Sequence, residues 1–305
     1  MSSLVKRVIQ HPELVWMRLG MMGVFNWMSS ERYIRIYYRL AFGKKIDLEN
    51  PQKYTEKINW CKIHWYNPLV EKCVDKYEVR EYVAQRIGSQ YLNDLYGMWE
   101  HFEDIDFDSL PSEFVLKVTN GSGDIYVCKD KDKMNLDEVL KKLNRFKHQN
   151  MYYANREWPY LKANRRYIAE RLIHSSDGTA IKDYKIFCFY GEPQFCFVGS
   201  DRDTTVKFDF FDKEWNYIPV TNGHDHKKPM PTKPKYWEEM LKISRILSKD
   251  FPHVRVDLYE EEGRVYFGEL TFFHFGGFVK FEPEKYDYEF GKYFDLTRIP
   301  ESERR

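Results

Sequence analysis

Hydrophobic and polar residues alternate with two different periods along the chain, and these periods predict where helices and strands lie. Residues 1–45 look helical and basic, and four later segments, 55–65, 75–88, 135–150 and 234–251, have the apolar spacing of amphipathic helices. The residues suited to cap or end these helices are Thr55, Asp75, Gly88, Asn135 and Asp137.

Strand-like runs dominate from residue 112 onward. Residues 112–130 read as two strands around a glycine loop, 166–173 alternate, 183–201 read as two strands joined at 191–193, and 254–277 read as a hairpin. Helices followed by long antiparallel meanders favour an α+β fold over a doubly wound parallel sheet. The sequence has no G-x-G-x-x-G between a strand and a helix, which argues against a Rossmann domain.

The hairpin at 254–277 carries charged residues among strongly apolar neighbours. Gly263 predicts a three-residue loop whose last residue is left-handed, and this loop pairs Glu260 with Arg264. Because side chains alternate between faces, one face then carries Arg255, Asp257, Glu269 and Thr271. The other face should meet the core with Val254, Val256, Leu258, Tyr266 and Leu270.

In this register Asp257 and Glu269 are diagonal neighbours, about 7–8 Å apart between Cα atoms, and both can reach one cation or a pair of cations. Hard oxygen ligands in a small set suit Mg²⁺, which completes its shell with water and substrate phosphates. A two- or four-residue loop would put the two acids on opposite faces. The competing interpretation is an Arg255–Glu269 ion pair on a solvated face, with Asp257 exposed.

A lysine precedes the glycine loop of the first strand pair: Lys117 lies on the strand, and the loop holds Gly121, Ser122 and Gly123. Such a loop can present backbone N–H groups to an oxyanion, and the lysine can add a point charge on the same phosphate chain. The spacing is not that of a Walker A motif. A plain hairpin turn is the competing interpretation.

Composition narrows the class of protein. The chain has 305 residues, 43% of them hydrophobic and 17% aromatic, which is ample for a large core, and a net charge of +1 gives no reason to expect a nucleic-acid partner. The five cysteines are scattered without a C-x-x-C pair, so reduced, buried thiols are expected rather than disulfides or a zinc site.

The N-terminal region shows no signal-peptide pattern, which predicts a cytoplasmic protein. Its most apolar run, 14–28, is shorter than the roughly 20 residues of a membrane span and is interrupted by Arg18. We expect a helix packed on the body of the protein. Peripheral contact with the inner face of a membrane is the alternative. The sequence does not indicate the oligomeric state.

Three features follow one another in a fixed order: a lysine-bearing strand with a glycine loop, the alternating "AERLI" segment, and the acid-bearing hairpin. With the phrases "NPQKYTEKINW", "VDKYEVREYV", "LPSEFVLKVTNGSGD", "DYKIFCFYGEP" and "GELTFFHFGG", this order resembles the ATP-grasp superfamily. It is most similar to the TupA-like ATP-grasp group, named for teichuronopeptide synthesis, over residues 50–280.

The resemblance implies two α+β subdomains that clasp ATP, preceded by a helical N-terminal region. The implied divisions are an N-terminal helical region (1–50), a helical part of the catalytic domain (51–111), a small lobe with the glycine loop (112–173), a large lobe with the metal-binding hairpin (174–285) and a C-terminal tail (286–305).

The resemblance also implies roles for individual residues. Lys76 (or Arg80 one turn on) and Lys117 would reach the ATP phosphates, and the glycine loop would close over them. The "AERLI" segment would adjoin adenine through Glu170 and the backbone of Arg171 and Leu172. Asp183 would contact the ribose, and Lys185 lies two residues further on the same face. Lys207 would reach the terminal phosphate.

At the hairpin, Asp257 and Glu269 match the metal-binding acids of the family, and Arg255 matches the arginine that stabilises a developing oxyanion. Thr271 departs from the pattern, because many members have Glu-x-Asn at the metal and this chain has Glu269-Leu270-Thr271. A threonine offers a neutral oxygen at best. The implied cofactors are therefore ATP and one or two Mg²⁺ ions held chiefly by the two acids.

The implied reaction activates a carboxylate as an acylphosphate, which an amine or another nucleophile then attacks. The acceptor would be a small molecule or a glycan, lipid-linked or free, of cell-surface polysaccharide synthesis. Alternatives are a sugar phosphotransferase on the same fold, a glycosyltransferase, and a non-catalytic binding module. The one D-x-D-like stretch that a glycosyltransferase could use, 201–203, is interpreted as a polar turn.

Two further segments attract attention without carrying a function. His224 and His226 lie in a flexible loop without a cysteine partner, so a structural or substrate-facing role is expected rather than a zinc site. The aromatic run 151–160 could stack on a sugar, but packing beneath the ATP-binding sheet explains it equally well.

Overall fold

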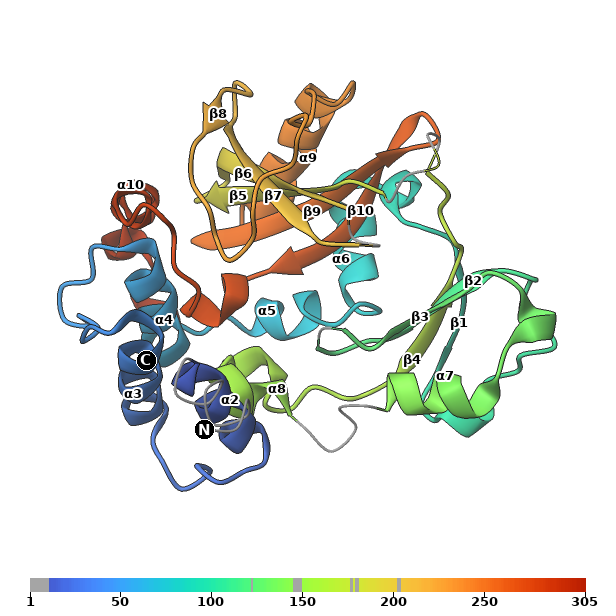
Figure 1. Ribbon diagram of the computed structural model, residues 1–305, viewed down its shortest axis with the longest axis horizontal. Helices are drawn as coiled ribbons and strands as arrows, with labels where there is room; N and C mark the ends of the chain where they lie inside the picture. The colour runs from blue at the N-terminus through green and yellow to red at the C-terminus, as the bar shows by residue number, and fades with distance from the viewer. Residues whose placement is uncertain (1–10, 122, 145–149, 176–177, 179–180, 202–203) are drawn as a thin grey trace.

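The computed structural model describes residues 11–305 apart from 122, 145–149, 176–177, 179–180 and 202–203. Its two separate antiparallel sheets, with strand orders β1-β4-β2-β3 and β10-β9-β5-β6-β7-β8, confirm the predicted α+β organisation. Figure 1 shows the four-stranded sheet on the right, the six-stranded sheet above, and the N-terminal helices at the lower left.

The strands follow the predicted runs. Those of the four-stranded sheet are β1 (Leu95–Trp99), β2 (Phe114–Val118), β3 (Ile125–Cys128) and β4 (Tyr167–Glu170). Those of the six-stranded sheet are β5 (Asp183–Phe189), β6 (Glu192–Ser200), β7 (Lys207–Asp212), β8 (Tyr217–Ile218), β9 (His253–Glu261) and β10 (Arg264–Thr271). Strand β1 lies within 51–111, a segment expected to be helical, and pairs with β4.

The helices cover the sheets and the N-terminal side. They are α2 (Pro12–Met21), α3 (Ser30–Phe42), α4 (Tyr54–His64), α5 (Pro68–Cys73), α6 (Val79–Ile87), α7 (Leu136–Leu143), α8 (Met151–Asn155), α9 (Trp237–Ser248) and α10 (Lys285–Tyr293). The short 3₁₀ turn η5 (His274–Gly277) follows β10.

Helix α2 ends earlier than the apolar run 14–28 predicted. The chain turns at Gly23, whose φ of 82° is left-handed, and re-enters a helix at Ser30 after Ser29 accepts a cap bond from the N–H of Arg32. Aromatic packing holds these helices on the body, as Tyr37 stacks on Phe278 at 3.8 Å between ring centroids. No helix among the described residues is long and apolar enough to cross a membrane.

Helix α4 forms where the apolar spacing placed it, but Thr55 is not its cap. Lys53 occupies the N-cap, and Glu56 accepts bonds from the backbone N–H of Gln52 and of Lys53. Thr55 lies inside the helix, where Asp287 of α10 accepts its N–H at 2.9 Å and its hydroxyl at 2.7 Å. Thr55 therefore binds a carboxylate 232 positions away and does not cap the helix.

The six-stranded sheet packs against α9 and the aromatic residues of α4 and α10. Phe195 shows the density of this core, since it stacks on Phe187 at 4.4 Å and on Phe290 at 3.8 Å. The four-stranded sheet has its own smaller core under α7, which Asn135 caps as predicted. All five cysteines are free and buried, as expected.

The hairpin differs from its predicted register in two places. Glu261 pairs with Arg264, so the loop has two residues, Glu262 and Gly263, with φ of 52° and 76°. A bulge at Gly268 then adds one residue to β10 and places Glu269 directly opposite Asp257. The expected diagonal arrangement of the two acids is therefore wrong.

The shorter loop and the bulge cancel beyond Gly268, so Arg255, Asp257, Glu269 and Thr271 do share one face. Between the loop and the bulge only the shorter loop has an effect, so the residues there lie on the face opposite to the predicted one. Tyr266 pairs with Tyr259 and lies on the charged face of the hairpin, not on the core face to which the sequence assigned it.

Candidate active site

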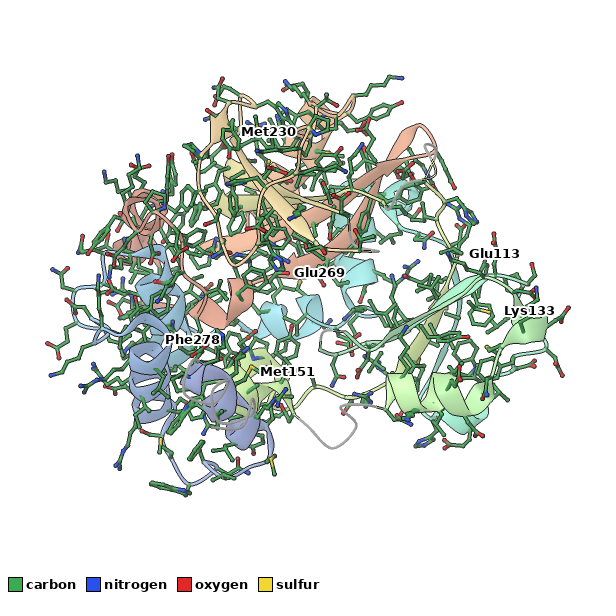
Figure 2. All side chains as sticks on the ribbon, viewed as in Figure 1. Glu113, Lys133, Met151, Met230, Glu269 and Phe278 are labelled. Atoms are coloured by element: carbon green, nitrogen blue, oxygen red, sulfur yellow. The ribbon has the colours of Figure 1, made fainter. Side chains whose placement is uncertain are left out.

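Two adjoining cavities lie around the charged face of the hairpin. One, of about 230 Å³, is lined by both sheets and is here termed the inter-sheet cavity. The other, of about 250 Å³, is lined by α8, η5 and the hairpin and is termed the α8 cavity. They share Lys76, Gly121, Gly268 and Glu269, so Glu269 stands at the boundary between them. Figure 2 shows Glu269 at the centre of the molecule, above the helix that carries Met151.

Arg255 organises the buried side of this face. Its Nε donates to Oδ1 of Asp257 and its Nη2 to Oδ2, both at 2.7 Å, which is a bidentate ion pair. Nη2 also lies 3.3 Å from Oε1 of Glu269 and 3.0 Å from Oγ1 of Thr271. The Arg255–Glu269 ion pair of the competing interpretation does form, but Arg255 is 6% exposed and Asp257 0%, so the expected solvated face and exposed aspartate are wrong.

His274 fixes the far side of the same guanidinium. Burial and the nearby positive charge of Arg255 hold the pKa of His274 well below its ordinary value, so the ring is neutral. Nη1 of Arg255 donates to Nδ1 at 2.7 Å, which leaves the ring proton on Nε2 to be donated to Oδ1 of Asn222 at 2.7 Å. Arg255 is thus held in one orientation by groups from three segments.

Asp257 lies between two cations. Besides Arg255, Nζ of Lys185 binds Oδ2 of Asp257 and lies 2.6 Å from Oδ2 of Asp183. Burial raises the pKa of Asp257 to about 6, against the lowering effect of Arg255 and Lys185. Strand pairing brings these groups together, since β5 places Lys185 opposite Asp257.

Glu269 is the acid that faces open space, with its side chain 43% exposed. Burial would raise its pKa, but the positive charges of Lys185, Arg255 and Lys76 outweigh that effect and hold the pKa at about 2. Glu269 is therefore ionised at neutral pH and lines both cavities.

The opposite wall of the inter-sheet cavity carries charges from the four-stranded sheet. Strand β2 pairs with β4 so that Lys117 and Glu170 come together, with Nζ at 2.5 Å from Oε2. Nη1 of Arg80 lies 3.1 Å from the other oxygen, Oε1. Lys117, Glu170 and Arg80 therefore form one ion-pair group that faces Lys185 and Asp183 across the cavity.

The glycine loop reaches this cavity with Gly121 and Gly123, whose φ angles of 84° and 94° require glycine. Ser122 lies outside the described residues. Nζ of Lys76 donates to the carbonyl of Gly121 at 2.7 Å, and burial lowers the pKa of this lysine. Lys76 thus ties the entry segment of α6 to the loop.

Three of the residues predicted to contact the nucleotide do not line the inter-sheet cavity. The backbone N–H of Arg171 donates to Asp94 and its carbonyl accepts from Asn93, so both groups are already used, and Leu172 is absent from the cavity wall. Lys207 starts β7 and pairs with Asp225 at 3.4 Å, away from both cavities. Asn93 and Ile173 line the wall where the hinge was expected.

Sequence reasoning assigned no site role to several residues that the structure brings to the site. His274 lay in the phrase "GELTFFHFGG", and its place shortly after Glu269 in the sequence was the only signal. Glu157 and Tyr160 lay inside the aromatic run and line the α8 cavity. Tyr259 and Phe267 line the inter-sheet cavity next to Gly268.

The remaining candidate segments are structural where the structure describes them. Nδ1 of His226 donates to the carbonyl of Phe208 at 3.0 Å and lies 3.3 Å from Asp209, while His224 packs on the ring of Phe208. In 201–203, Asp201 pairs with Lys227 at 2.7 Å, and residues 202–203 lie outside the described residues. No group of three or more His, Cys, Asp or Glu side chains among the described residues could hold a metal.

The chain is similar to several solved structures at low sequence identity. The D-alanine–D-alanine ligase of Bacillus anthracis is 17% identical, with a TM-score of 0.38 over 65% of this chain and 56% of that chain. The Helicobacter pylori ligase of the same name is 15% identical, with a TM-score of 0.38 over 72% and 62%. The N5-carboxyaminoimidazole ribonucleotide synthetase of Thermus thermophilus is 7% identical, with a TM-score of 0.39 over 67% and 46%.

The matches span less than two thirds of the length of these structures. A search of curated proteins finds no match. The profile of one family, described as TupA-like ATPgrasp, matches residues 56–295. That match covers most of the chain and includes both sheets, both cavities and the hairpin, so the protein belongs to the TupA-like ATP-grasp family and has the ATP-grasp fold that its sequence predicted.

Proposed function

We propose that the protein is an ATP- and Mg²⁺-dependent ligase that activates a carboxylate as an acylphosphate for attack by an amine. One observation carries the proposal: Lys117, Lys76 and Lys185 converge with Glu269 on the inter-sheet cavity, and Glu269 also lines a second cavity that contains Arg255. A phosphoryl donor and an acceptor need two adjoining sites with fixed charge at their boundary.

The inter-sheet cavity suits a nucleotide. Its apolar wall is formed by Leu92, Ile125, Ile173, Tyr259 and Phe267, which can pack on a base. Its polar wall holds the three lysines and the glycine loop, whose positive charges and backbone N–H groups suit phosphates. Lys117 and Lys185 are each paired with carboxylates of their own sheet, and Lys76 binds the carbonyl of Gly121, so bound phosphates would compete with these groups for the lysines.

The donor set also fits Mg²⁺. Glu269 is ionised and half exposed, and Asp257 lies directly opposite it with oxygens now bound by Arg255 and Lys185. These two acids would hold the ion, with nucleotide oxygens and water completing a hard-oxygen shell. When bound, Mg²⁺ supplies positive charge to the phosphates. Thr271 offers only a neutral hydroxyl, which accepts from Arg255, so we do not assign it to the metal.

Arg255 is suited to the acceptor side. It lines the α8 cavity and is held by Asp257 and His274, so its charge needs no reorientation when negative charge develops on a reacting carbonyl oxygen. Family membership supports an acceptor from cell-surface polysaccharide synthesis, a small molecule or a glycan.

The experiment measures ADP release from ATP and Mg²⁺ with a panel of uronic acids and amino acids in the presence of hydroxylamine. A ligase that forms an acylphosphate yields ADP and a hydroxamate only when its carboxylate is present. Glu269→Gln should lose both products, and Lys207→Met, outside both cavities, should retain them.

The alternatives give different results in this assay or in a thermal-stability measurement. ADP release with a neutral sugar and no hydroxamate would identify a sugar phosphotransferase and overturn the proposal. Thermal stabilisation by a UDP-sugar but not by ATP with Mg²⁺ would identify a glycosyltransferase. ATP binding without ADP release on any acceptor of the panel would favour a binding module.

A further inference from the structure

The α8 cavity contains a buried acid for which the proposed reaction has so far given no role. Glu157 lines this cavity, is 8% exposed, and accepts one hydrogen bond, from Nδ2 of Asn155 at 3.0 Å. Among the described residues no lysine, arginine or histidine lies within ion-pair distance of it, and the charge of Lys62 acts on it only from farther away. A buried carboxylate usually has a cationic or metal partner, so its placement at a cavity wall points to a ligand.

The wall that carries Glu157 is held rigidly from three directions. Helix α8 ends at Asn155, and the left-handed Arg156, with φ of 61°, turns the chain so that Glu157 follows directly. Nζ of Lys62 donates to the carbonyl of Asn155 at 2.8 Å and also binds the carbonyl of Gly276. Any Cβ at Gly276 would lie 2.8 Å from Asn155, so only glycine allows η5 to approach this closely.

Glu157 and Glu269 act on one cavity. Both acids affect the phenol of Tyr160. Burial raises the pKa of this phenol most, and the negative charges of Glu157 and Glu269 raise it further. Met151 completes the wall on the other side, next to the glycine loop, since a Cβ at Gly121 would touch its Cγ at 3.4 Å. The cavity therefore extends from the phosphate-binding loop to Glu157.

We propose that the α8 cavity binds a small primary amine, with its ammonium group on the carboxylate of Glu157, and that Glu157 accepts the proton that frees the nitrogen lone pair. This inference rests on the proposed ligase function and names the nucleophile's class and its site. Burial raises the pKa of Glu157 against the lowering effect of Lys62, and a raised pKa makes a carboxylate a better proton acceptor near neutral pH.

The proposed step exchanges a C–O bond for a C–N bond. The ammonium loses one proton to Glu157, and the freed lone pair forms a C–N bond with the carbonyl carbon of the acylphosphate. The bond from that carbon to the oxygen that bridges to phosphorus breaks, and phosphate leaves with the electron pair. The nitrogen then loses its second proton to the departing phosphate or to water. No oxidant or further reactant is needed.

The size and surface of the cavity limit the amine. A volume of about 250 Å³ admits a head group of the size of an amino acid or an amino sugar, not a chain of sugars. Phe273, Phe275 and Tyr160 offer aromatic surface for either source. An amino acid and an amino sugar both present a primary amine on a small molecule.

The test compares Glu157→Gln with the full-length wild type in two ADP-release assays, using the carboxylate identified above. In the first, the nucleophile is an amino acid or an amino sugar. In the second it is hydroxylamine, which is largely unprotonated at neutral pH and needs no proton acceptor. We expect kcat/KM for the amine to fall by about 10²–10⁴-fold and the hydroxylamine reaction to change less than about 3-fold.

Controls separate this inference from the function on which it rests. Glu113→Gln changes an exposed acid at the right of Figure 2 that lines neither cavity, and it should leave both rates unchanged. Equal loss of both rates in Glu157→Gln, or no loss in either, would overturn the role of Glu157. Absence of hydroxylamine-dependent ADP release in the wild type would instead overturn the proposed function. Activity with the amino acid but not the amino sugar, or the reverse, identifies the source of the amine.

Discussion

Arg255 binds Asp257 through two parallel hydrogen bonds of 2.7 Å, Nε to Oδ1 and Nη2 to Oδ2, between side chains two positions apart on one face of β9. Asp257 is fully buried, and it also binds Lys185. Asp257→Asn would leave the buried Arg255 and the partly buried Lys185 without their shared carboxylate, so we expect the free energy of unfolding to fall by about 3–5 kcal/mol. Urea unfolding followed by circular dichroism measures this change.

An exposed ion pair provides the matched control. Arg35 and Glu31 form an i,i+4 pair at 2.7 Å on the surface of α3, and Glu31→Gln should change stability by less than about 0.5 kcal/mol. A similar loss in both variants would mean that burial does not decide the strength of the Arg255–Asp257 pair.

Two lysines with similar implied roles should behave differently. Lys185 lines the inter-sheet cavity, whereas Lys207 lies outside it and pairs with Asp225. We expect Lys185→Met to raise the Kd for ATP with Mg²⁺ by at least about 10-fold, the effect of one charge-assisted phosphate contact, and Lys207→Met to leave it unchanged. Calorimetric titration decides, and equal affinities for the two variants would remove Lys185 from the nucleotide site.

His253 should make the protein sensitive to acid. Its Nδ1 donates to the carbonyl of Cys188 at 3.0 Å and its Nε2 accepts from the hydroxyl of Tyr54 at 2.9 Å, so the folded state holds a neutral ring. Burial lowers the pKa of His253 to about 3, while the ring titrates near 6.5 in the unfolded chain. The unfolded state therefore binds the proton first, and stability falls as the pH drops from about 6.5 toward 3.

The variant His253→Gln, which keeps a donor and an acceptor but does not titrate, isolates this effect. The difference in unfolding free energy, wild type minus variant, should decrease by up to about 1.4 kcal/mol for each pH unit between pH 6 and pH 4. Chemical unfolding at a series of pH values measures it. A difference that stays constant over that range would show that His253 does not carry the acid sensitivity.

Gly268 should not tolerate a side chain. A Cβ there would lie 2.8 Å from Cε2 of Tyr259 and 3.0 Å from the carbonyl oxygen of Asp257, which is backbone and cannot move aside. We expect Gly268→Ala to cost about 1–3 kcal/mol and to weaken Mg²⁺–ATP binding by displacing Glu269. Gly199→Ala on β6, where the nearest atom would be 3.7 Å away, is the control and should be nearly neutral.

The sequence predicted what depends on neighbours along the chain. Helix α7 with its Asn135 cap and the β5–β6 hairpin formed as expected, because apolar periodicity and caps act over a few residues. Thr55 failed as a cap because Asp287, distant in sequence, binds it. The Glu157 wall was missed for the same reason, since Lys62 and Gly276 reach it from distant segments.

The hairpin shows how a correct grouping can follow from a wrong register. The loop is one residue shorter than predicted, and the bulge at Gly268 adds one residue, so the charged face came out right while Tyr266 did not. Strand alternation alone reveals neither the shorter loop nor the bulge. Each shifts the cross-strand pairing by one residue, and the two shifts together return Glu269 and Thr271 to the predicted face.

The bulge separates the face on which Glu269 lies from the path that the strand takes. Phe267 pairs with Leu258 and Glu269 with Asp257, so deleting Gly268 would leave both pairs opposite each other and Glu269 on the charged face. The extra residue instead bends β10 and increases its twist at this point. Gly268 therefore sets the direction in which β10 carries Glu269 past the two cavities.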